Sequence, residues 1–385
     1  MADGVTVGRS SEEITRSAVL LTPRLPRDFY HLANGEKLMS NPIRIGIIGA
    51  GEIFRLRHFP ELAKIDDAKV VAICNRSAES AAAIADEFGL DPDITTDPHA
   101  LMARADIDAV MIGTWPYKHC PFVLESLDRG KHTFVQARMA MNLREAKAMY
   151  AKAQETGLAT QIYPSLFGFK GHNVMKRLID DGYLGEVRNI HTRFLGGDIA
   201  DAARPLHWRQ VARYSGLNAL AMGIVVETVQ RWYGYMKTVS AQARTFTRDR
   251  PLASGQGSGP VERPDTVYVT GEMESGALAA FLFSGVARFG VEPQIEAYGS
   301  KGTLIYNLTS DTILGAQAGA DGLAEIPVPD DEVKEWTVEQ DFIHLIKTGT
   351  PAWTTFAEGV KYMEFTEAVF RSVERGSSVN LPLAD

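Results

Sequence analysis

Cysteine is scarce in this sequence of 385 residues, and long hydrophobic runs are missing. The two cysteines, Cys74 and Cys120, lie far apart without C-x-x-C spacing. This favours two buried free thiols over the alternatives of a disulfide or a metal site, so we predict no metal centre. The longest apolar run near the N-terminus, Ala18 to Leu21, is too short for a signal peptide core or a membrane span. The expected location is therefore the cytoplasm.

An excess of positive charge is missing too. Lys and Arg number 40 against 48 Asp and Glu, which gives a formal net charge of -8. Nucleic acids and anionic membranes reward clustered basic residues, so neither is an expected partner. Scattered basic side chains could still line a pocket for an anionic small molecule. The hydrophobic content of 45% is typical of a globular protein, and the length exceeds what one ordinary core accommodates.

Two domains are predicted behind an N-terminal extension of residues 1–40, which has no clear periodicity. Over residues 41–163, short apolar runs alternate with helical stretches, which indicates βαβ units and a doubly wound parallel sheet of the Rossmann type. The expected strands are IRIGIIGAG, AKVVAICN, DAVMIGT, KHTFVQA and ATQIYP. The expected helices are FRLRHFPELAKI, SAESAAAIADEFG, PFVLESLDRG and NLREAKAMYAKAQETG.

The pattern changes over residues 164–385. Segments such as EVRNIHTRFLGG, DTVYVTGEME and GTLIYNL alternate in polarity and are separated by glycine-containing turns. They predict an α+β domain for substrate binding and oligomerisation, with a large, open, mostly antiparallel sheet. Residues 250–264 are rich in Gly, Pro and Ser and are interpreted as a loop. The amphipathic helix expected at 356–375 could pack back on the first domain.

A candidate dinucleotide site follows the first strand, in the sequence GAGEIF at residues 49–54. The spacing G-x-G permits a tight turn and lets backbone N–H groups approach a pyrophosphate at a helix N-terminus. Gly49, Gly51, Glu52 and Ile53 are therefore predicted to bind the cofactor; the alternative is an ordinary glycine turn. The third position of the fingerprint, usually Gly or Ala, is Phe54, whose ring we expect to displace the helix slightly from the strand.

The end of the second strand, where the adenosine ribose should lie, reads Asn75-Arg76-Ser77. An Asp or Glu here would hold the 2′-hydroxyl of NAD and repel a 2′-phosphate. Asn75 lacks that carboxylate, while Arg76 and Ser77 could bind a phosphate. The sequence thus favours NADP over NAD; the alternative is that Arg76 is a solvated side chain at the start of a helix.

Several segments, in order, resemble the glucose–fructose oxidoreductase/inositol dehydrogenase/rhizopine-catabolism family, known as Gfo/Idh/MocA. They are IGIIGAGEIFRLRHFPEL, DIDAVMIGTWPYKHCPFVLESLDRGKHTFVQARMAMNLREA, LGEV, HWRQVARYSG, EAYGSKGTL and the tail DFIHLIKTGTPAWTTFAEGVKYMEFTEAVFRS. The resemblance implies nicotinamide-dependent redox chemistry on sugars, cyclitols or related polyols. It also implies homo-oligomers, dimers or tetramers, built through the C-terminal sheet. Pro116 and His119 stand where the resemblance implies contacts with the cofactor.

The departures from the family lie at the chemistry. The turn after the fourth expected strand usually reads Glu-Lys-Pro in the family, and here it is Gln136, Ala137 and Arg138. The resemblance also implies an Asp and, four residues on, a His along a helix, where this sequence has Ala221 and Val225. Glu227 is on another face of that helix and is interpreted as half of a surface ion pair with Arg231.

Arg138 cannot replace the lysine as a proton carrier, because a guanidinium does not lose its proton usefully. It could stabilise an alkoxide that develops during hydride transfer, or clamp a carboxylate or phosphate of the substrate. The alternative is an Arg138 that points outward without a role. Gln136 can still hydrogen-bond a ribose hydroxyl.

Other candidates for proton transfer are Tyr163, Lys170, His172 and His207, each of which is also an ordinary polar residue at the end of an element. Trp115 and Tyr117 could pack against the nicotinamide or the substrate, or belong to the core.

The leading hypothesis is an NAD(P)-dependent oxidoreductase acting on a sugar, cyclitol or related polyol, with altered proton-transfer residues. A redox-neutral enzyme that retains its cofactor, for glycoside cleavage or epimerisation, is the second. A non-catalytic sensor that binds cofactor or sugar is the third. The third follows from the loss of the lysine and the Asp/His pair, since general acid–base groups typically contribute ~10²–10⁴ in rate.

Overall fold

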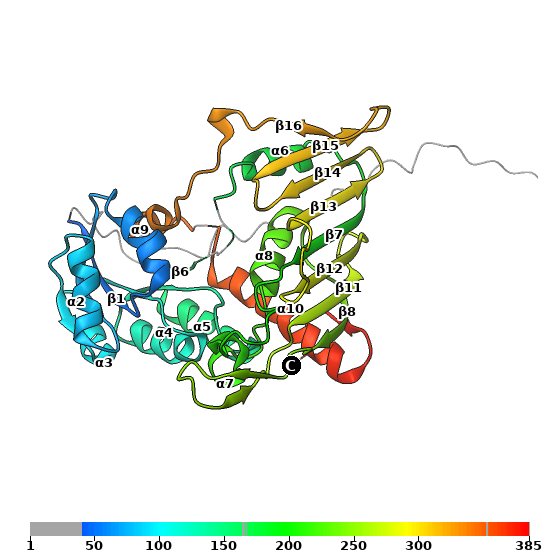
Figure 1. Ribbon diagram of the computed structural model, residues 1–385. Coiled ribbons are helices and arrows are strands. Elements are labelled where there is room, and N and C mark those ends of the chain that lie inside the picture. Colours follow the sequence, from blue (N-terminus) through cyan, green and yellow to red (C-terminus); the bar gives the residue numbers. More distant parts are fainter. Residues whose placement is uncertain (1–40, 164–165, 167, 352, 385) are drawn as a thin grey trace, which may run out of the picture. The chain divides into compact units, whose positions relative to one another are not determined.

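The computed structural model describes residues 41–163, 166, 168–351 and 353–384. The extension expected over residues 1–40 lies outside the described residues. Two large sheets organise the described chain (Figure 1). One has six strands in the order β3-β2-β1-β4-β5-β6, and the other has nine in the order β16-β15-β14-β13-β7-β12-β11-β8-β17. The predicted fold class, a Rossmann sheet with an α+β part and a large mostly antiparallel sheet, is confirmed.

All strand pairs of the six-stranded sheet are parallel. Its strands are β1 (Ile43–Ile48), β2 (Ala68–Cys74), β3 (Asp93–Thr95), β4 (Ala109–Ile112), β5 (His132–Val135) and β6 (Thr160–Ile162). The central strands are buried on both faces, which explains their near-continuous apolar sequences. The strand order reverses between β1 and β4, and ligands of such sheets bind at the carboxyl ends of the strands beside this point.

Short helices connect these strands. They are η1 (Phe54–His58, a π-helix), α1 (Phe59–Leu62), α2 (Ala78–Glu87), α3 (Pro98–Met102), η2 (Pro116–Lys118, a 3₁₀-helix), α4 (His119–Asp128) and α5 (Leu143–Thr156). The single helix predicted after the glycine turn is therefore divided into η1 and α1. Neither β3 nor α3 was predicted, because both are too short to show periodicity.

In the nine-stranded sheet, the β7–β12 pair is parallel and all other pairs are antiparallel. Its strands are β7 (Val187–Leu195), β8 (Thr238–Arg244), β11 (Thr266–Glu272), β12 (Leu278–Ser284), β13 (Gln294–Gly299), β14 (Gly302–Asn307), β15 (Thr312–Gln317), β16 (Ala324–Ile326) and β17 (Val379–Asn380). The interpretation of residues 250–264 as a loop is wrong in part, because β9 (Asp249–Pro251) and β10 (Ser258–Pro260) pair there as an antiparallel ribbon.

Two helices, α8 (Met222–Tyr233) and α10 (Phe356–Arg375), build the core on this sheet. Val225 and Val229 of α8 and Phe365 of α10 share one buried cluster with Phe281 and Phe283 of β12. Helix α10 also packs against α5 and β6, so it contacts the parallel-sheet part as well. The remaining helices here are α6 (His172–Asp180), η3 (Trp208–Gln210), α7 (Ala212–Ser215), η4 (Asp330–Glu332) and α9 (Val338–Thr348).

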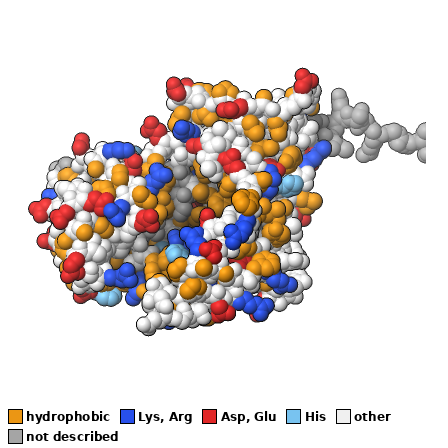
Figure 2. Space-filling view, in the orientation of Figure 1, with side chains coloured by type: hydrophobic (Ala, Val, Ile, Leu, Met, Phe, Trp, Pro, Cys, Tyr) orange, Lys and Arg blue, Asp and Glu red, His pale blue; other side chains and the backbone are white. Residues whose placement is uncertain are grey.

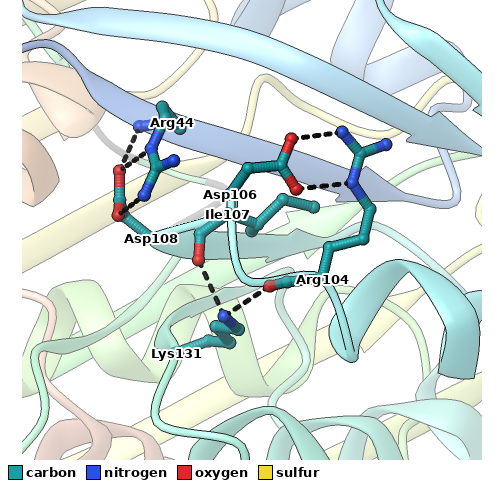
Figure 3. Close-up of polar contacts among 6 residues, drawn as sticks. All are labelled: Arg44, Arg104, Asp106, Ile107, Asp108 and Lys131. Carbon is teal, nitrogen blue, oxygen red and sulfur yellow. Dashed lines mark hydrogen bonds and ion pairs between the residues drawn. The ribbon is translucent and has the colours of Figure 1, made fainter.

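A polar network closes the amino ends of the parallel strands (Figure 3). Arg44, at the start of β1, donates from Nε and Nη2 to the two carboxylate oxygens of Asp108, at 2.9 and 2.7 Å. Arg104 pairs in the same way with Asp106. Lys131 is buried and donates to the carbonyl oxygens of Arg104 and Ile107, at 2.7 and 2.8 Å. The charges of both arginines are therefore matched by carboxylates of the protein, and the ammonium group of Lys131 is held by backbone carbonyl oxygens.

Both cysteines are free and buried, as predicted. Among the described residues, no group of three or more His, Cys, Asp or Glu side chains is arranged to hold a metal ion. No described helix is both long and apolar enough to cross a membrane. On the face shown in Figure 2, basic and acidic side chains are interspersed among hydrophobic ones rather than gathered by sign.

Candidate active site

The turn after β1 needs its two glycines for different reasons. Gly49 has a φ of +81°, and a Cβ at this position would lie 2.9 Å from the backbone nitrogen of Thr114. Gly51 is exposed, and a Cβ there would meet no described atom closer than 3.9 Å. The space above Gly51 is thus open to a ligand, as the close approach of a diphosphate requires. Glu52 and Ile53 follow, exposed at the same edge.

Phe54, the unusual residue of this turn, is accommodated by a glycine on the neighbouring strand. Its ring is buried, and a Cβ on Gly113, just after β4, would lie 2.3 Å from a ring atom. The absence of a side chain at Gly113 therefore creates the space that the ring fills. The helix begins here with the π-helical turn η1, a local irregularity often found at functional sites.

The end of β2 lies next to the glycine turn. The side-chain amide of Asn75 donates to the carbonyl oxygen of Ala50 at 3.3 Å, which ties the two segments together. Ser77 is the N-cap of α2, where its Oγ accepts from the N–H of Ser80 at 3.3 Å. Arg76 is exposed and forms no ion pair with a described residue. Its guanidinium therefore needs to break no internal contact to meet a phosphate.

Gln136, just after β5, belongs to a buried chain of hydrogen bonds. Its Nε2 lies 2.6 Å from Nε2 of His58, whose Nδ1 lies 2.5 Å from a carboxylate oxygen of Glu339. The indole of Trp336 donates to the other oxygen of Glu339 at 2.7 Å. Because an amide nitrogen can only donate, His58 accepts through Nε2 and donates through Nδ1–H to the carboxylate. One N–H of the Gln136 amide is thereby used, and its second N–H and its carbonyl oxygen are left for the ribose contact we predicted.

His119 is completely buried, so the geometry favours positioning over the predicted contact with the cofactor. Its Nε2 lies 2.8 Å from the carbonyl oxygen of Thr114, and its Nδ1 lies 3.0 Å from that of Arg138 and 3.2 Å from that of Met139. Burial lowers the pKa of His119, although these carbonyls act against that shift. The ring holds the segment after β4 against the turn after β5.

Arg138 lies inward from that turn, which contradicts the alternative of an outward side chain. Its Nη2 donates to the carbonyl oxygen of Leu220, and its Nε is buried without a hydrogen-bond partner among the described residues. Burial, with a smaller contribution from the charge of Arg209, lowers the pKa of Arg138 to about 10. The guanidinium remains charged at neutral pH. It lines a small pocket together with Pro116, Ala137, Trp208, Arg209, Ser215, Asn218 and Leu220.

Aromatic rings form one side of this region. Trp115 stacks on Trp208 with ring centroids 5.0 Å apart and planes at 12°, and Tyr214 meets Trp115 edge-on at 5.2 Å. Arg209 lies over the Trp208 ring, with its guanidinium carbon 4.4 Å from the centroid. Trp115 and Tyr117 thus join a cluster with residues of η3 and α7. Contact of Trp115 with the nicotinamide stays a prediction.

A second small pocket lies on the other side of Ala137. Tyr163, Glu227 and Glu358 line it, together with Ala137, Ile162, Ile224, Thr354, Gly359 and Tyr362. Burial raises the pKa of Tyr163 to about 12, and burial also raises the pKa of Glu227 and of Glu358. The interpretation of Glu227 as a surface residue is wrong. The ion pair with Arg231 is present at 2.7 Å, but both side chains are buried.

The other candidates for proton transfer lie outside both pockets. Lys170 is exposed, and its backbone nitrogen donates to Asp311 at 3.1 Å. His207 caps η3, where its Nδ1 accepts from the N–H of Arg209 at 3.3 Å. His172 is buried and accepts from the Trp232 indole at 3.0 Å, and burial lowers its pKa to about 3. Of the four, the structure brings only Tyr163 beside Ala137.

The sequence matches two family models in succession. Residues 43–163 match "Oxidoreductase family, NAD-binding Rossmann fold", and residues 172–305 match the Gfo/Idh/MocA C-terminal domain. Together they span more than half of the chain. The chain belongs to the Gfo/Idh/MocA oxidoreductase family. It is therefore an oxidoreductase with an NAD-binding Rossmann fold, as the resemblance implied.

Among the curated members of the family, similarity extends over nearly the whole chain. Inositol 2-dehydrogenase of Burkholderia lata is 25% identical, covering 89% of this chain and 97% of that protein. Levoglucosan dehydrogenase of Pseudarthrobacter phenanthrenivorans is 24% identical, covering 82% and 89%. A shorter match, 35% identical over 120 residues, is to 4-carboxy-2-hydroxymuconate-6-semialdehyde dehydrogenase of Sphingobium sp., covering 31% of this chain and 38% of that one.

Solved structures of other oxidoreductases share the fold. The structure of an oxidoreductase domain protein from Kribbella flavida matches with a TM-score of 0.81 at 23% identity, covering 89% of this chain and all of that one. Levoglucosan dehydrogenase in complex with NADH and levoglucosan matches with a TM-score of 0.79 at 21% identity, again covering 89% and 100%. At these identities the comparison establishes the fold alone.

Proposed function

We propose that this protein transfers a hydride between a nicotinamide nucleotide and a CH–OH or C=O carbon of a sugar, cyclitol or related polyol. The observation that carries the proposal is the place of Arg138. This cation lies at the carboxyl end of the parallel sheet, in a pocket that no described acidic side chain lines. The names of the curated relatives, inositol and levoglucosan dehydrogenase, support a sugar or cyclitol substrate.

The residues around the glycine turn fit a dinucleotide. The backbone N–H groups of Ala50, Glu52 and Ile53 would hold the diphosphate, since those of Gly49 and Gly51 donate to the carbonyl oxygens of Cys74 and Gly49. The open space above Gly51 admits the ligand. When bound, the nucleotide supplies or accepts the hydride. Asn75 would bind the adenosine ribose, and the unpaired Arg76 with Ser77 would bind a 2′-phosphate. We therefore propose NADP as the preferred cofactor, with NAD as the alternative.

In this proposal Arg138 stabilises negative charge on the substrate and Tyr163 donates the proton. Reduction of a carbonyl leaves negative charge on its oxygen, and a fixed guanidinium stabilises that charge where water is excluded. Arg138 keeps its proton at neutral pH, so it acts as a charge and not as a proton donor. Tyr163, whose pKa is raised to about 12 by burial, holds a proton that an alkoxide can take. Ala137 lines both pockets, and its side chain is too short to carry a charged or proton-transferring group into either.

We further propose a homo-oligomer, a dimer or a tetramer, formed through the nine-stranded sheet. The large side chains Tyr268 on β11 and Leu278 on β12 are 49% and 61% exposed there. Exposed apolar groups on a sheet face are typical of an interface. Sedimentation equilibrium tests the proposal, and a monomer at micromolar concentration contradicts it.

Calorimetric titration with NADP⁺, NADPH, NAD⁺ and NADH, followed by a panel of sugars and polyols monitored at the absorbance of the reduced nicotinamide, tests the function. We expect nucleotide binding and turnover of at least one polyol. Cofactor that remains bound through purification, without net redox turnover, supports a redox-neutral enzyme. Nucleotide binding without any turnover supports a sensor, and no binding of any nucleotide contradicts both enzymatic hypotheses and a cofactor-binding sensor.

A substitution of Arg76 tests the proposed preference for NADP over NAD. Arg76→Ala should weaken NADP⁺ binding by about tenfold or more and leave NAD⁺ binding nearly unchanged, because only the 2′-phosphate pairs with the guanidinium. Equal losses for the two nucleotides would remove Arg76 from recognition of the 2′-phosphate.

A further inference from the structure

The Arg138 pocket contains more positive charge than hydride transfer to a neutral sugar requires. Arg138 and Arg209 both line it, and the charge of Arg209 acts on Arg138. Two guanidiniums at one pocket repel each other. No described acidic side chain lines the pocket, although the charge of Glu52 acts on Arg209 from outside it. Such an arrangement costs stability unless an anion joins it.

Asn218 adds a hydrogen-bond acceptor to the same pocket, in contrast to the two guanidiniums, which only donate. It is only 8% exposed, and its amide nitrogen donates to the carbonyl oxygens of Ala140 and Ser215 at 2.8 and 2.7 Å. These two bonds fix the orientation of the amide, so Oδ1 must be the acceptor. Oδ1 is buried without a hydrogen-bond partner among the described residues. A buried acceptor without a partner is costly, and a hydroxyl group of a bound molecule would satisfy it.

We propose that the substrate is a sugar or polyol that carries a compact oxyanion, held by Arg209, with a hydroxyl group donated to Asn218 Oδ1, while Arg138 stays with the reacting oxygen. The proposal rests on the function proposed above and narrows its substrate class to sugar acids or sugar phosphates. Carboxylates and phosphates are the groups that guanidiniums bind best. The Trp208 ring packs against the Arg209 guanidinium and orients it, and no described residue accepts a hydrogen bond from that side chain.

Matched pairs of compounds that differ only in the anionic group test the proposal. The pairs are glucuronate with glucose, gluconate with glucitol, and glucose 6-phosphate with glucose. We expect kcat/KM for the better anionic class to exceed that of its neutral partner by about tenfold or more. The preference should fall as ionic strength rises, because salt screens a pair near the surface. The better anionic class identifies the oxyanion as carboxylate or phosphate.

Arg209→Gln is the variant that tests the pocket, because Arg209 is exposed and its loss should leave folding intact. It should lower kcat/KM for the anionic compound by about 10- to 100-fold, and by at least tenfold more than it lowers that of the neutral partner. Arg213→Gln is the matched control. Arg213 lies over the Tyr214 ring at 4.6 Å, much as Arg209 lies over Trp208, but it lines neither pocket. It should change neither value.

Equal use of anionic and neutral partners, or equal losses in Arg209→Gln, would overturn the oxyanion proposal while leaving the dehydrogenase proposal intact. Binding of the same compounds is also measured by calorimetry, on the protein alone and on the protein saturated with nucleotide. Binding of the anionic compound that Arg209→Gln abolishes supports the pocket even when no turnover occurs. If the anionic compound binds neither the protein alone nor the protein saturated with nucleotide, the oxyanion proposal is overturned, whether or not nucleotide itself binds.

Discussion

At the amino ends of the parallel strands, Arg44 and Arg104 each donate two hydrogen bonds to a carboxylate (Figure 3). At the carboxyl ends, Arg138 and Arg209 line a pocket that no described carboxylate lines. Both ends contain arginine in the same fold, so residue type alone does not distinguish them. The difference is whether the protein itself supplies the counter-charge.

A buried cation without a protein partner lowers stability, since desolvation is not offset. Perturbed pKa values with this origin gather at functional sites. Burial lowers the pKa of Arg138 to about 10, whereas the carboxylate of Asp108 has a pKa below its usual value, because the hydrogen bonds of Arg44 outweigh the effect of burial. One end is therefore arranged for stability and the other for a ligand. Each prediction below asks whether a residue affects stability, activity, or both.

The largest expected effect is at Arg138. Arg138→Ala should lower kcat/KM by about 10²–10³, the typical loss when a group that stabilises developing charge is removed. The free energy of unfolding should change by less than about 1 kcal/mol, because a poorly compensated buried charge is removed with it. Steady-state kinetics and urea titration measure the two quantities. Arg138→Lys keeps a charge and should retain more activity; an alanine variant with unaltered turnover would exclude Arg138 from the mechanism.

Tyr163→Phe comes next. It removes only the hydroxyl group that we propose as the proton donor, and kcat for reduction should fall by about 10². Nucleotide binding should be unchanged, and the ring contacts with His58 and Trp336, at 4.9 and 5.4 Å, remain. Single-turnover kinetics at several pH values give the measurement. Retention of full activity in the phenylalanine variant would mean that the proton comes from another group, with the buried Glu227 as the next candidate.

Much of the fold was predictable, since buried parallel strands such as β1 and β4 have continuous apolar sequences and α10 has strong amphipathic periodicity. The edge strand β3 was not, because three residues with polar neighbours show no pattern. Likewise, from Phe54 alone we expected that its ring displaces the helix slightly from the strand. Its accommodation depends on Gly113, a residue nearly sixty positions away that no local rule connects to it.

The candidate site was predictable only where the chemistry is local. The glycine turn and Arg138 could be identified from their neighbours. The i, i+4 spacing correctly paired Glu227 with Arg231, but spacing says nothing about what covers a pair, and here both side chains are buried. The contact of Gln136 with His58 and Glu339 joins residues from three distant segments, so a sequence-based expectation of a ribose contact could not include it.

The hydrogen-bonded residues Gln136, His58 and Glu339 combine features of both ends of the sheet. Their polar groups have partners within the protein, as at the amino ends, but they lie at the carboxyl ends. Glu339→Gln leaves one oxygen where the carboxylate has two, so either His58 or Trp336 loses its acceptor. We expect a loss of about 1–3 kcal/mol in the free energy of unfolding. We also expect kcat to fall more than nucleotide binding, because His58 no longer fixes Gln136. Destabilisation with unchanged kcat would make these hydrogen bonds purely structural.

The smallest expected effect is at the amino end. Asp108→Asn should lower the free energy of unfolding by roughly 1 kcal/mol, since Arg44 is 42% exposed and solvent screens the pair. The pKa of Asp108 is lowered in the folded state, so its contribution is complete above the unfolded value of ~3.9 and is lost as the pH falls through the folded value. Urea titrations at pH 7 and pH 3 should therefore show a difference between variant and parent that shrinks in acid. The control is Asp106→Asn, where we expect a smaller change because the Asp106 side chain is 53% exposed and that of Asp108 is 14% exposed. Neither substitution should alter kcat/KM, because neither residue lines either pocket. A loss of activity would mean that the two ends of the sheet are coupled rather than separately specialised.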